Sequence, residues 1–479
     1  MSNPLDNDLD QLYAESAAWQ VNTGTTTIHA KRLPGRWRRI KWWAAAVWLI
    51  FFLGPYVPWD GRQAVLFDIP NRQYHLFAVT VLPQDFWMLS LLLLFFAVLL
   101  AVTTVIAGRV YCGFFCFQTV WTDVFTWLEE WLEGPPQQRR QPRPLTKQRL
   151  QRLAIKHGLW LLIGLLTGLS FVAWFYGAIP LWRDFFVGAA NGVVYTFVAL
   201  FTAGTYLLAG WLREQVCFWL CPYARIQGVM LDRTTIVPAY DLSRGEPRGR
   251  LKKDAAANSQ GDCIDCNLCV AVCPTGIDIR KGQQEGCITC ALCLDACDQV
   301  MDKIDRPRGL IRYASLDELE GQPTRSLLTR PRVWLYGAIL LLSLSGILYG
   351  LSTINTVELH VLHEQSPLFV ELSDGSIQNR YTLKIFNKTH QAATLSVTAT
   401  AAVPLTLHGV ESELTLGAGE ITPVVAYIKI APQWLDHQPL TLNFALTGRL
   451  ADGTLVNANR DHVFYHFPAN YPLEITQSD

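Results

Sequence analysis

The sequence predicts a multi-domain membrane protein: a bundle of five transmembrane helices, a small inserted α+β domain rich in cysteine, and a C-terminal β-sandwich. Five apolar stretches are each close to the roughly 20 residues that cross a bilayer as a helix. All 12 cysteines lie between Cys112 and Cys297. Beyond residue 354 the sequence changes to short alternating runs separated by turn residues, which is typical of β-strands.

The composition is that of a membrane-embedded chain. Of the 479 residues, 50% are hydrophobic, 12% are aromatic and 17% are charged, with a mean hydropathy of +0.18, whereas soluble proteins have about 25% charged residues. The 40 basic and 40 acidic residues cancel, so no net positive charge indicates nucleic-acid binding. The first forty residues are polar, so we expect no signal peptide.

Basic residues set the expected orientation of the spans. The spans are expected at about 42–59, 86–107, 157–178, 189–211 and 333–353. The segments before the first span, at 108–154 and at 212–332 are rich in Lys and Arg, whereas 60–85 and 179–188 are not. Because positively charged loops stay in the cytoplasm, we expect a cytoplasmic N-terminus and an outward C-terminus.

The expected organisation follows from these spans. It consists of a cytoplasmic N-terminal segment (1–40), four transmembrane helices (41–232), a cytoplasmic cysteine-rich domain (233–332), the fifth helix (333–354) and an outward domain (355–479). In the last domain, alternating runs at 381–387, 393–400, 422–430, 440–446 and 462–467 predict a β-sandwich of immunoglobulin-like type.

Eight of the cysteines form two copies of one motif. Cys263, Cys266, Cys269 and Cys273 have the spacing C-x2-C-x2-C-x3-C, and Cys287, Cys290, Cys293 and Cys297 repeat it. In this pattern the fourth cysteine of each run binds the cluster of the other run. The motif therefore predicts a bacterial two-cluster ferredoxin-like domain with two 4Fe–4S clusters, one held by Cys263, Cys266, Cys269 and Cys297, the other by Cys287, Cys290, Cys293 and Cys273. The alternative is a pair of structural zinc sites.

The other four cysteines form two C-x3-C pairs at the expected cytoplasmic membrane edge. These pairs are Cys112 with Cys116 and Cys217 with Cys221. On a helix, residues four apart share one face, and we expect the neighbouring Arg109 and Arg213 to lower the thiol pKa. Two facing pairs would make a soft sulfur site suited to Cu(I). The alternative is that these cysteines are buried apolar residues of membrane helices.

Four of the seven histidines beyond the fifth span are candidate ligands. His360 and His363 lie just beyond it, and His462 and His466 are expected to share one face of the last strand. Outward copper binding is conceivable there, but we expect solvated or strand-face histidines.

Four long motifs resemble one family. GRVYCGFFCFQTVWTD (108–123), REQVCFWLCPYARIQGVMLD (213–232), DCIDCNLCVAVCPTGIDIR (262–280) and DACDQVMDKIDRPRGLIRY (295–313) are similar to the cytochrome c oxidase accessory proteins of the CcoG/FixG/RdxA group. The resemblance implies a multi-pass protein of the bacterial inner membrane with a periplasmic immunoglobulin-like domain. It also implies reduction of Cu(II) to Cu(I) for assembly of a cbb-type oxidase, with Cys112, Cys116, Cys217 and Cys221 as the catalytic, copper-interacting thiols. The family usually has proline where this chain has Phe117.

Two other functions remain open at this point. One is a quinol-linked membrane electron conduit of the NapH-like type, and the other is a non-catalytic copper chaperone or assembly scaffold. The expected partners are a cytoplasmic electron donor, copper-transport and oxidase-assembly proteins, and membrane lipid. The sequence allows a homodimer.

Overall fold

The computed structural model describes most of the chain. The described residues are 12–14, 19, 21–22, 27–59, 61–70, 72–77, 79–81, 86–136, 139, 144, 146–251, 260–323, 326–353, 356–389, 391–435 and 440–466. Parts of the expected N-terminal segment (1–40) and the end of the expected outward domain therefore lie outside the described residues.

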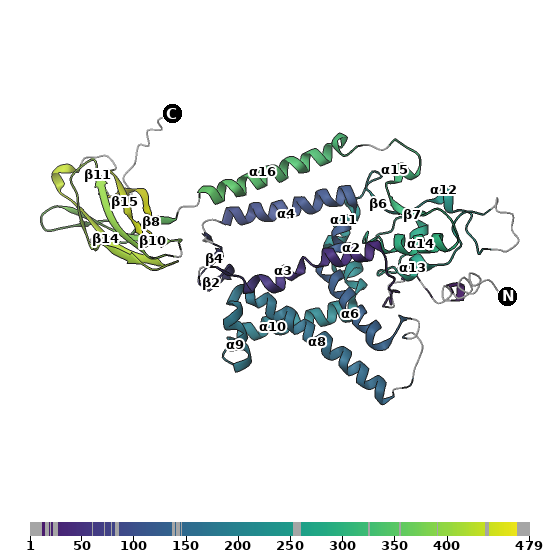
Figure 1. Cartoon of the computed structure of the whole chain (residues 1–479). Coiled ribbons are helices and arrows are strands. Elements are labelled where there is room, and N and C mark those ends of the chain that lie inside the picture. The colour runs from purple at the N-terminus through teal and green to yellow at the C-terminus, as the bar shows by residue number, and fades with distance from the viewer. Residues whose placement is uncertain are drawn as a thin grey trace. The chain divides into compact units, whose positions relative to one another are not determined.

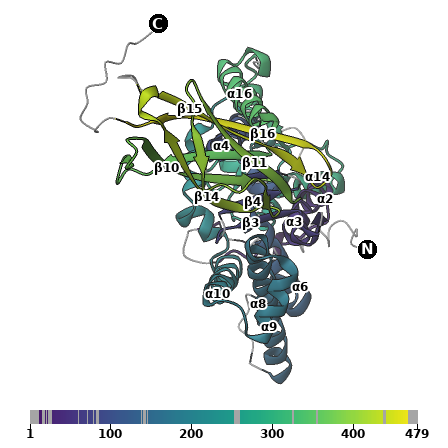
Figure 2. The same ribbon diagram turned by 90° about the vertical axis from the view of Figure 1, so that its left-hand side faces the viewer.

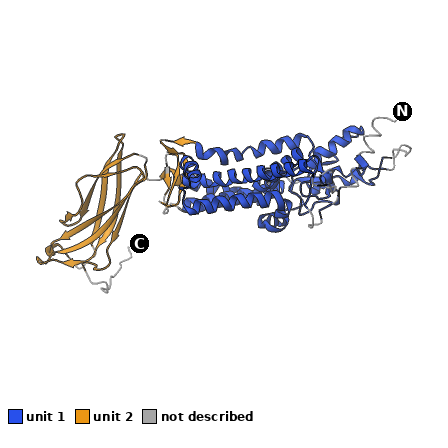
Figure 3. Cartoon of the chain, turned by 90° about the horizontal axis from the view of Figure 1, so that it is seen from below, with its two compact units in different colours: residues 1–56, 87–348 blue, residues 57–86, 349–479 orange. Residues whose placement is uncertain are grey.

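The chain forms two compact units (Figure 3). The first contains residues 1–56 and 87–348, which include the long helices and both cysteine runs. The second contains residues 57–86 and 349–479, which include the large β-sheets. Residues 57–86 thus join the C-terminal domain in one unit, and Gln73 Nε2 donates a hydrogen bond of 2.7 Å to the carbonyl of Gly419.

Four helices of the described residues are long and apolar enough to cross a membrane (Figure 1). They are α4 (Phe86–Ala107), α8 (Lys147–Tyr176), α10 (Gly192–Thr205) with its π-helical continuation to Leu212, and α16 (Pro331–Thr353). They overlap the expected spans at 86–107, 157–178, 189–211 and 333–353, although α8 begins ten residues before its expected span.

The first expected span, 42–59, does not form one long helix. Instead α2 (Arg36–Ala45) and α3 (Trp48–Leu53) are separated by a turn, and a 3₁₀ turn follows at Gly54–Tyr56. The α-helix ends at Leu53 and passes directly into the 3₁₀ turn, where Gly54 keeps helical backbone angles before Pro55. The first helix, α2, begins at Arg36, six residues before the expected start of the span. Its basic residues Arg38 and Lys41 are buried.

Two helices occupy a segment that the sequence indicated only as a basic loop. α5 (Val110–Phe114) and α6 (Phe117–Glu133) follow α4 directly. On α6, the Asp123 carboxylate contacts Lys41 Nζ at 2.5 Å and Arg38 Nη1 at 3.8 Å. Burial opposes ionisation of Asp123, but Lys41, Arg38 and Arg32 together outweigh it and lower its pKa.

The cysteine-rich domain is a small α+β fold within the first unit. β6 (Val237–Tyr240) pairs antiparallel with β7 (Ile311–Ala314). Between them in sequence lie α13 (Leu268–Ala271) and α14 (Leu292–Lys303), each of which follows the second cysteine of one run. Buried apolar side chains such as Ile264, Leu310 and Met301 fill the space between these elements.

The second unit contains the β-sandwich that the alternating runs predicted (Figures 1 and 2). One sheet has the order β12–β14–β10–β8, with β9 (Val370–Glu371) also pairing with β10, and the other has the order β13–β11–β15–β16. The strand bounds are β8 (Val357–His363), β10 (Ile377–Asn387), β11 (Ala393–Ala401), β12 (Thr406–His408), β13 (Leu414–Leu416), β14 (Ile421–Ile430), β15 (Leu440–Leu450) and β16 (Leu455–Phe464).

Residues 58–81 add two small sheets to the second unit. One pairs β1 (Pro58–Trp59) with β2 (Arg62–Gln63), and the other is formed by β3 (Val65–Asp68), β4 (Gln73–Leu76) and β5 (Val79–Val81). The sequence indicated only a loop here, because the strands are too short for a clear alternation.

We expect Phe444→Ala to destabilise the sandwich by about 3–5 kcal/mol, since deletion of a buried aromatic side chain leaves a cavity. Phe444 is 0% exposed between the sheets. The measurement is pulse proteolysis of the full-length protein in urea, with the C-terminal fragment followed by mass. The control is Leu455→Ala, at a position 74% exposed on β16, and it should leave the midpoint unchanged; equal effects would contradict the assignment of this core.

Candidate functional site

The structure gathers four cysteines of the two runs around one cavity. Cys263, Cys266 and Cys269 of the first run and Cys297 of the second line it. Apolar side chains, among them Leu268, Val300 and Leu310, complete the lining. The grouping is the one that the crossed-ligand pattern predicts.

A second cavity takes the other members of the runs. Cys287, Cys290 and Cys293 line it together with Cys273. Cys269 lines both cavities, so the two cavities are neighbours in space.

The backbone repeats the same unusual geometry in both runs. Asp265 and Asn267 have φ of 52° and 53°, and Thr289 and Ala291 have φ of 51° and 60°. These residues occupy the same two places after the first cysteine of each run. Non-glycine residues rarely adopt positive φ, and such strain concentrates at functional sites. The repeat therefore indicates two loops wrapped in the same way around two similar groups.

The cavities fit a polynuclear cluster better than a single metal ion. Within the described part of the chain, no three His, Cys, Asp or Glu side chains converge closely enough to hold one ion. A structural zinc site needs four ligands that converge on one point, whereas cysteines spread around a cavity suit a cubane. Burial raises the pKa of Cys287 and of Cys297 to about 12, so these thiols need a bound metal to become thiolates.

Charged side chains close the first cavity on one side. Arg280 borders it and pairs with Asp278 at 2.8 Å and with Asp265 at 2.5 Å. Its Nη2 donates to Asn267 Oδ1 at 2.5 Å. Arg280 thereby holds the strained turn of the first run and places a positive charge next to it.

The two C-x3-C pairs have one local structure, but not the single helical face that their spacing suggested. Cys112 lies on α5, and Cys116 precedes the first residue of α6 in extended conformation. Cys217 lies in a π-helical turn (Val216–Leu220), and Cys221 precedes α11 (Pro222–Met230) in extended conformation. In each pair the second cysteine caps a new helix, because the helix breaks between the two thiols.

This geometry explains the departure at Phe117. Pro222 is the first residue of α11, where proline is favoured because its missing N–H would have no helical partner. Phe117 is the first residue of α6 and begins that helix equally well. Its ring stacks on Trp121 with centroids 4.2 Å apart, so aromatic packing takes the place of the proline.

The four thiols lie close enough to influence one another. Burial, together with the neighbouring Cys116 and Cys112, raises the pKa of Cys217 to about 12. The Cys112 Sγ donates to Gln227 Oε1 at 3.0 Å, and Gln227 is 1% exposed on α11. The hydrogen bond ties the first pair to the helix that follows the second pair.

The expectation that arginines lower these thiol pKa values is wrong for Cys112 and Cys217. Burial raises the pKa of Cys112 to about 11, and the opposing charge of Arg109 is too weak to reverse this. Arg213 is engaged elsewhere: its Nη2 contacts Glu129 Oε1 at 2.5 Å. Burial of these thiols depends on the tertiary structure, so the arginines close to them in the sequence could not predict it.

α5 packs directly on the second cysteine run. A Cβ atom added at Gly113 would lie 2.5 Å from the carbonyl oxygen of Ile288 and 2.9 Å from the Cα of Cys290. Arg109 donates a hydrogen bond to the carbonyl of Glu285. The helix that carries Cys112 is therefore in backbone contact with the loop that lines the second cavity.

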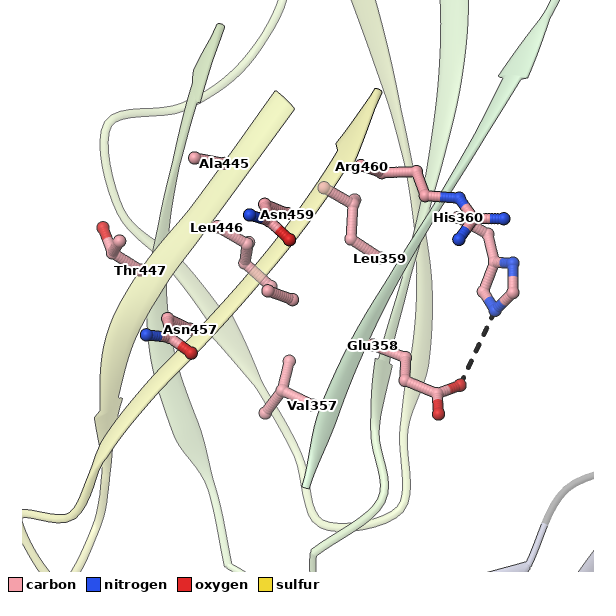
Figure 4. A pocket seen from close by; sticks show the side chains of 11 residues that line it. Val357, Glu358, Leu359, His360, Ala445, Leu446, Thr447, Asn457, Asn459 and Arg460 are labelled. Atoms are coloured by element: carbon pink, nitrogen blue, oxygen red, sulfur yellow. Dashed lines mark ion pairs between the residues drawn. The ribbon is translucent and has the colours of Figure 1, made fainter. Parts of the chain in front are cut away.

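The C-terminal domain has its own groove along β8, β15 and β16 (Figure 4). Val357 and Leu359 point toward β15 and β16, whereas Glu358 and His360 point to the other side of β8 and contact each other at 3.6 Å. His360 is thus a partly exposed histidine of the strand face, next to Glu358. β16 ends at Phe464, so His466 lies beyond the strand whose face it was expected to share.

Family models match most of the described elements. A 4Fe–4S dicluster domain matches residues 212–316, a 4Fe–4S binding domain matches 89–135, and the immunoglobulin-like fold at the C-terminus of FixG matches 347–466. Protein RdxB of Cereibacter sphaeroides is 42% identical over 81% of this chain and 87% of its own. Nitrogen fixation protein FixG of Rhizobium meliloti is 38% identical over 84% and 86%, and Protein RdxA of Cereibacter sphaeroides is 39% identical over 86% and 90%.

The chain belongs to the FixG/RdxA-like family. Its 4Fe–4S domains make it an iron–sulfur protein of an oxidoreductase family, and its four apolar helices fit a membrane protein. These matches confirm the predicted ferredoxin-like domain and the predicted immunoglobulin-like domain. The match over 89–135 extends the 4Fe–4S signature to the segment that contains Cys112 and Cys116.

Sequence reasoning missed four residues of the site: Gly113, Gln227, Arg280 and Glu129. Gly113 lies inside a C-x3-C pair, and its lack of a side chain was a signal for close backbone approach. Gln227 and Glu129 carry no such signal, because their partners are more than 80 residues away in the chain.

We expect Cys297→Ser to alter the same cluster as Cys269→Ser, and Cys273→Ser to alter the same cluster as Cys290→Ser, because each cavity mixes the two runs. Electron paramagnetic resonance of the dithionite-reduced protein should show two distinct signals in the parent, one perturbed by each pair of variants. If Cys297→Ser instead matched Cys290→Ser, each run would hold its own cluster and the crossed arrangement would be wrong.

Proposed function

We propose that this protein is a membrane-bound cupric reductase that supplies Cu(I) for assembly of a cbb-type cytochrome c oxidase. Cys112, Cys116, Cys217 and Cys221 hold the copper ion. The eight cysteines of the two runs hold two 4Fe–4S clusters, which when bound supply one-electron chemistry. The electrons come from a cytoplasmic one-electron donor.

The observation that carries this proposal is the backbone contact between α5 and the second cysteine run. Gly113 lies between Cys112 and Cys116, and it touches Ile288 and Cys290. The copper thiols and the second cavity are thus neighbours through one helix of five residues. The first cavity borders Arg280 and Tyr240 instead, so the second is the one that faces copper.

The thiol pairs suit a metal that binds briefly. Thiolates are soft ligands and favour Cu(I). In the described structure no three His, Cys, Asp or Glu side chains converge on one point, so the four thiols would hold the ion in an open arrangement rather than in a closed structural site. Cu(II) held there takes up one electron and becomes Cu(I), with no bond to a carbon substrate formed or broken, so no general acid or base is needed.

Arg109 supports the reduction electrostatically. It is 4% exposed, donates to the carbonyl of Glu285, and lies against Cys112. Its positive charge acts on Cys287 as well as on Cys112. A buried cation at this place stabilises added negative charge on both sides of it.

We further propose five membrane crossings in the bacterial inner membrane, with α2 and α3 together forming the first. The N-terminus and the cysteine-rich domain are cytoplasmic, and the C-terminal domain is periplasmic. The distribution of Lys and Arg supports this orientation. So does the second compact unit, because it joins residues 57–86 with 349–479, the two segments that this topology places on the outer side.

The proposed partners are copper-transport and oxidase-assembly proteins, and the protein is free to form a homodimer.

The quinol-linked alternative draws on one observation, the hydrogen bond of 3.0 Å between Tyr206 Oη and His157 Nδ1. In that case the clusters would be oxidised by a soluble quinone analogue. In the scaffold alternative they would not respond to copper at all.

The proposal is tested by mixing dithionite-reduced, desalted protein with Cu(II) without oxygen. The iron–sulfur absorbance and the Cu(I)–bathocuproine colour are followed together in a stopped-flow instrument, and we expect both to change at one rate. Cys112→Ser with Cys217→Ser should slow that rate by at least about tenfold, since copper is then misplaced. Unchanged clusters on addition of Cu(II) would exclude the reductase.

We expect Gly113→Ala to slow the oxidation of the reduced protein by Cu(II) severalfold, because a methyl group there must push α5 away from Ile288. Iron content and reduction by dithionite should stay at the parent level. Gly158→Ala is the matched control, because a Cβ atom there meets nothing within 4 Å. Parent rates in Gly113→Ala would show that this contact does not govern the transfer.

A further inference from the structure

Two histidines of the C-terminal domain occupy inward-facing positions of edge strands. On β8, His363 continues the buried row Val357, Leu359, Val361. On β16, His462 lies two residues before the buried Phe464, on the same face as Val456. β8 and β16 are the last strands of the two different sheets. Both rings are half-buried at the ends of rows that otherwise bury apolar side chains.

The imidazole rings of His363 and His462 lie next to each other, and both contact the ring of Tyr381. Their centroids are 6.1 Å apart with an interplanar angle of 25°. Both rings meet the edge of Tyr381, at 5.1 Å for His363 and 5.4 Å for His462. Tyr381 is 0% exposed and its hydroxyl donates to the carbonyl of Val463 at 2.9 Å. A fixed side chain thus holds both imidazoles in place.

The hydrogen bonds leave the same nitrogen free in each ring. His462 Nδ1 lies 3.2 Å from the carbonyl oxygen of Val463, and since a carbonyl only accepts, Nδ1 carries the proton. The Nε2 of His363 is buried and has no hydrogen-bond partner among the described residues. An Nδ1–H bonded to a backbone carbonyl is the arrangement that orients metal-binding histidines.

We propose that His363 and His462 form a Cu(I) site, with the ion bound between the two Nε2 atoms. Metal–nitrogen bonds of about 2 Å place the centroids of two imidazoles on a linear two-coordinate ion roughly 6 Å apart, close to the observed spacing. Imidazole binds copper well. The site lies outside the cysteine region and does not depend on the proposed reductase activity.

A site with two histidine ligands favours Cu(I) over Zn²⁺ and Cu²⁺. No third His, Cys, Asp or Glu side chain of the described residues converges with this pair. Zn²⁺ takes four ligands in structural sites and three protein ligands in catalytic ones, and Cu²⁺ prefers four in a plane. Cu(I) is stable with two. The groove of Figure 4 runs along the same strands, but its histidine, His360, is 40% exposed and paired with Glu358.

The test uses the full-length protein in detergent, in a background with Cys112, Cys116, Cys217 and Cys221 changed to Ser. A bathocuproine buffer keeps free Cu(I) low enough that the iron–sulfur absorbance does not change. We expect His363→Gln, His462→Gln and the double variant each to lose one bound Cu(I) ion per chain. The X-ray absorption spectrum of the bound copper should show two nitrogen neighbours that disappear in these variants.

His360→Gln is the matched control and should keep the ion, because it removes a histidine of the same strand that points away from the pair. Pulse proteolysis of the C-terminal domain identifies any variant that fails to fold, and for such a variant His363→Asn replaces His363→Gln. Full Cu(I) binding in the double variant would overturn the proposal. Equal losses in His360→Gln, or Zn²⁺ bound at the pair as tightly as Cu(I), would overturn it as well.

Discussion

The close approach of α5 to the second cysteine run is the constraint on which the rest of the first unit depends. Backbone can meet backbone there only because position 113 has no side chain, since a Cβ atom would lie 2.5 Å from a carbonyl oxygen. Arg109 fixes the same contact from one turn earlier by its hydrogen bond to Glu285. This junction, and not sequence proximity, brings the thiols of the C-x3-C pairs close to the cysteines of the inserted domain.

α6 extends that constraint to the second thiol pair. The helix begins immediately after Cys116, and twelve residues into it Glu129 contacts Arg213, which precedes Cys217 by four positions. Arg213 itself has a φ of 44° and ends the π-helical segment Tyr206–Leu212. Arg139 contacts the same carboxylate at 2.5 Å. Glu129 is therefore shared by Arg213 and Arg139, and its removal would leave these buried cations without that carboxylate, at a cost of about 3–5 kcal/mol. The positions of both thiol pairs are therefore set by a single charged helix.

The sequence predicted those features that are encoded locally. The spacing of Cys263 to Cys273 and its repeat predicted how the eight cysteines group, because a three-residue turn leaves the chain few ways to present its thiols. The period-two runs predicted β10, β11, β14 and β15, because each buries one face. The sequence did not reveal the break within each C-x3-C pair, although Pro222 was a helix-start signal. It also did not reveal the raised pKa of Cys112 and Cys217, because burial depends on helices that are distant in the chain. The pairing of His363 with His462 crosses from one sheet to the other, so neither strand alone could indicate it.

Under the proposed topology, the cysteine ligands lie on the cytoplasmic side of the membrane and the histidine ligands lie on the outer side. All 12 cysteines precede residue 298, where a reducing cytoplasm keeps thiols available for metals. The C-terminal domain has none, and a thiol pair there would oxidise to a disulfide. Imidazole resists such oxidation and still binds copper. A chain that handles copper on both sides of a membrane would therefore use sulfur inside and nitrogen outside, and the inward-facing histidines of β8 and β16 meet this requirement.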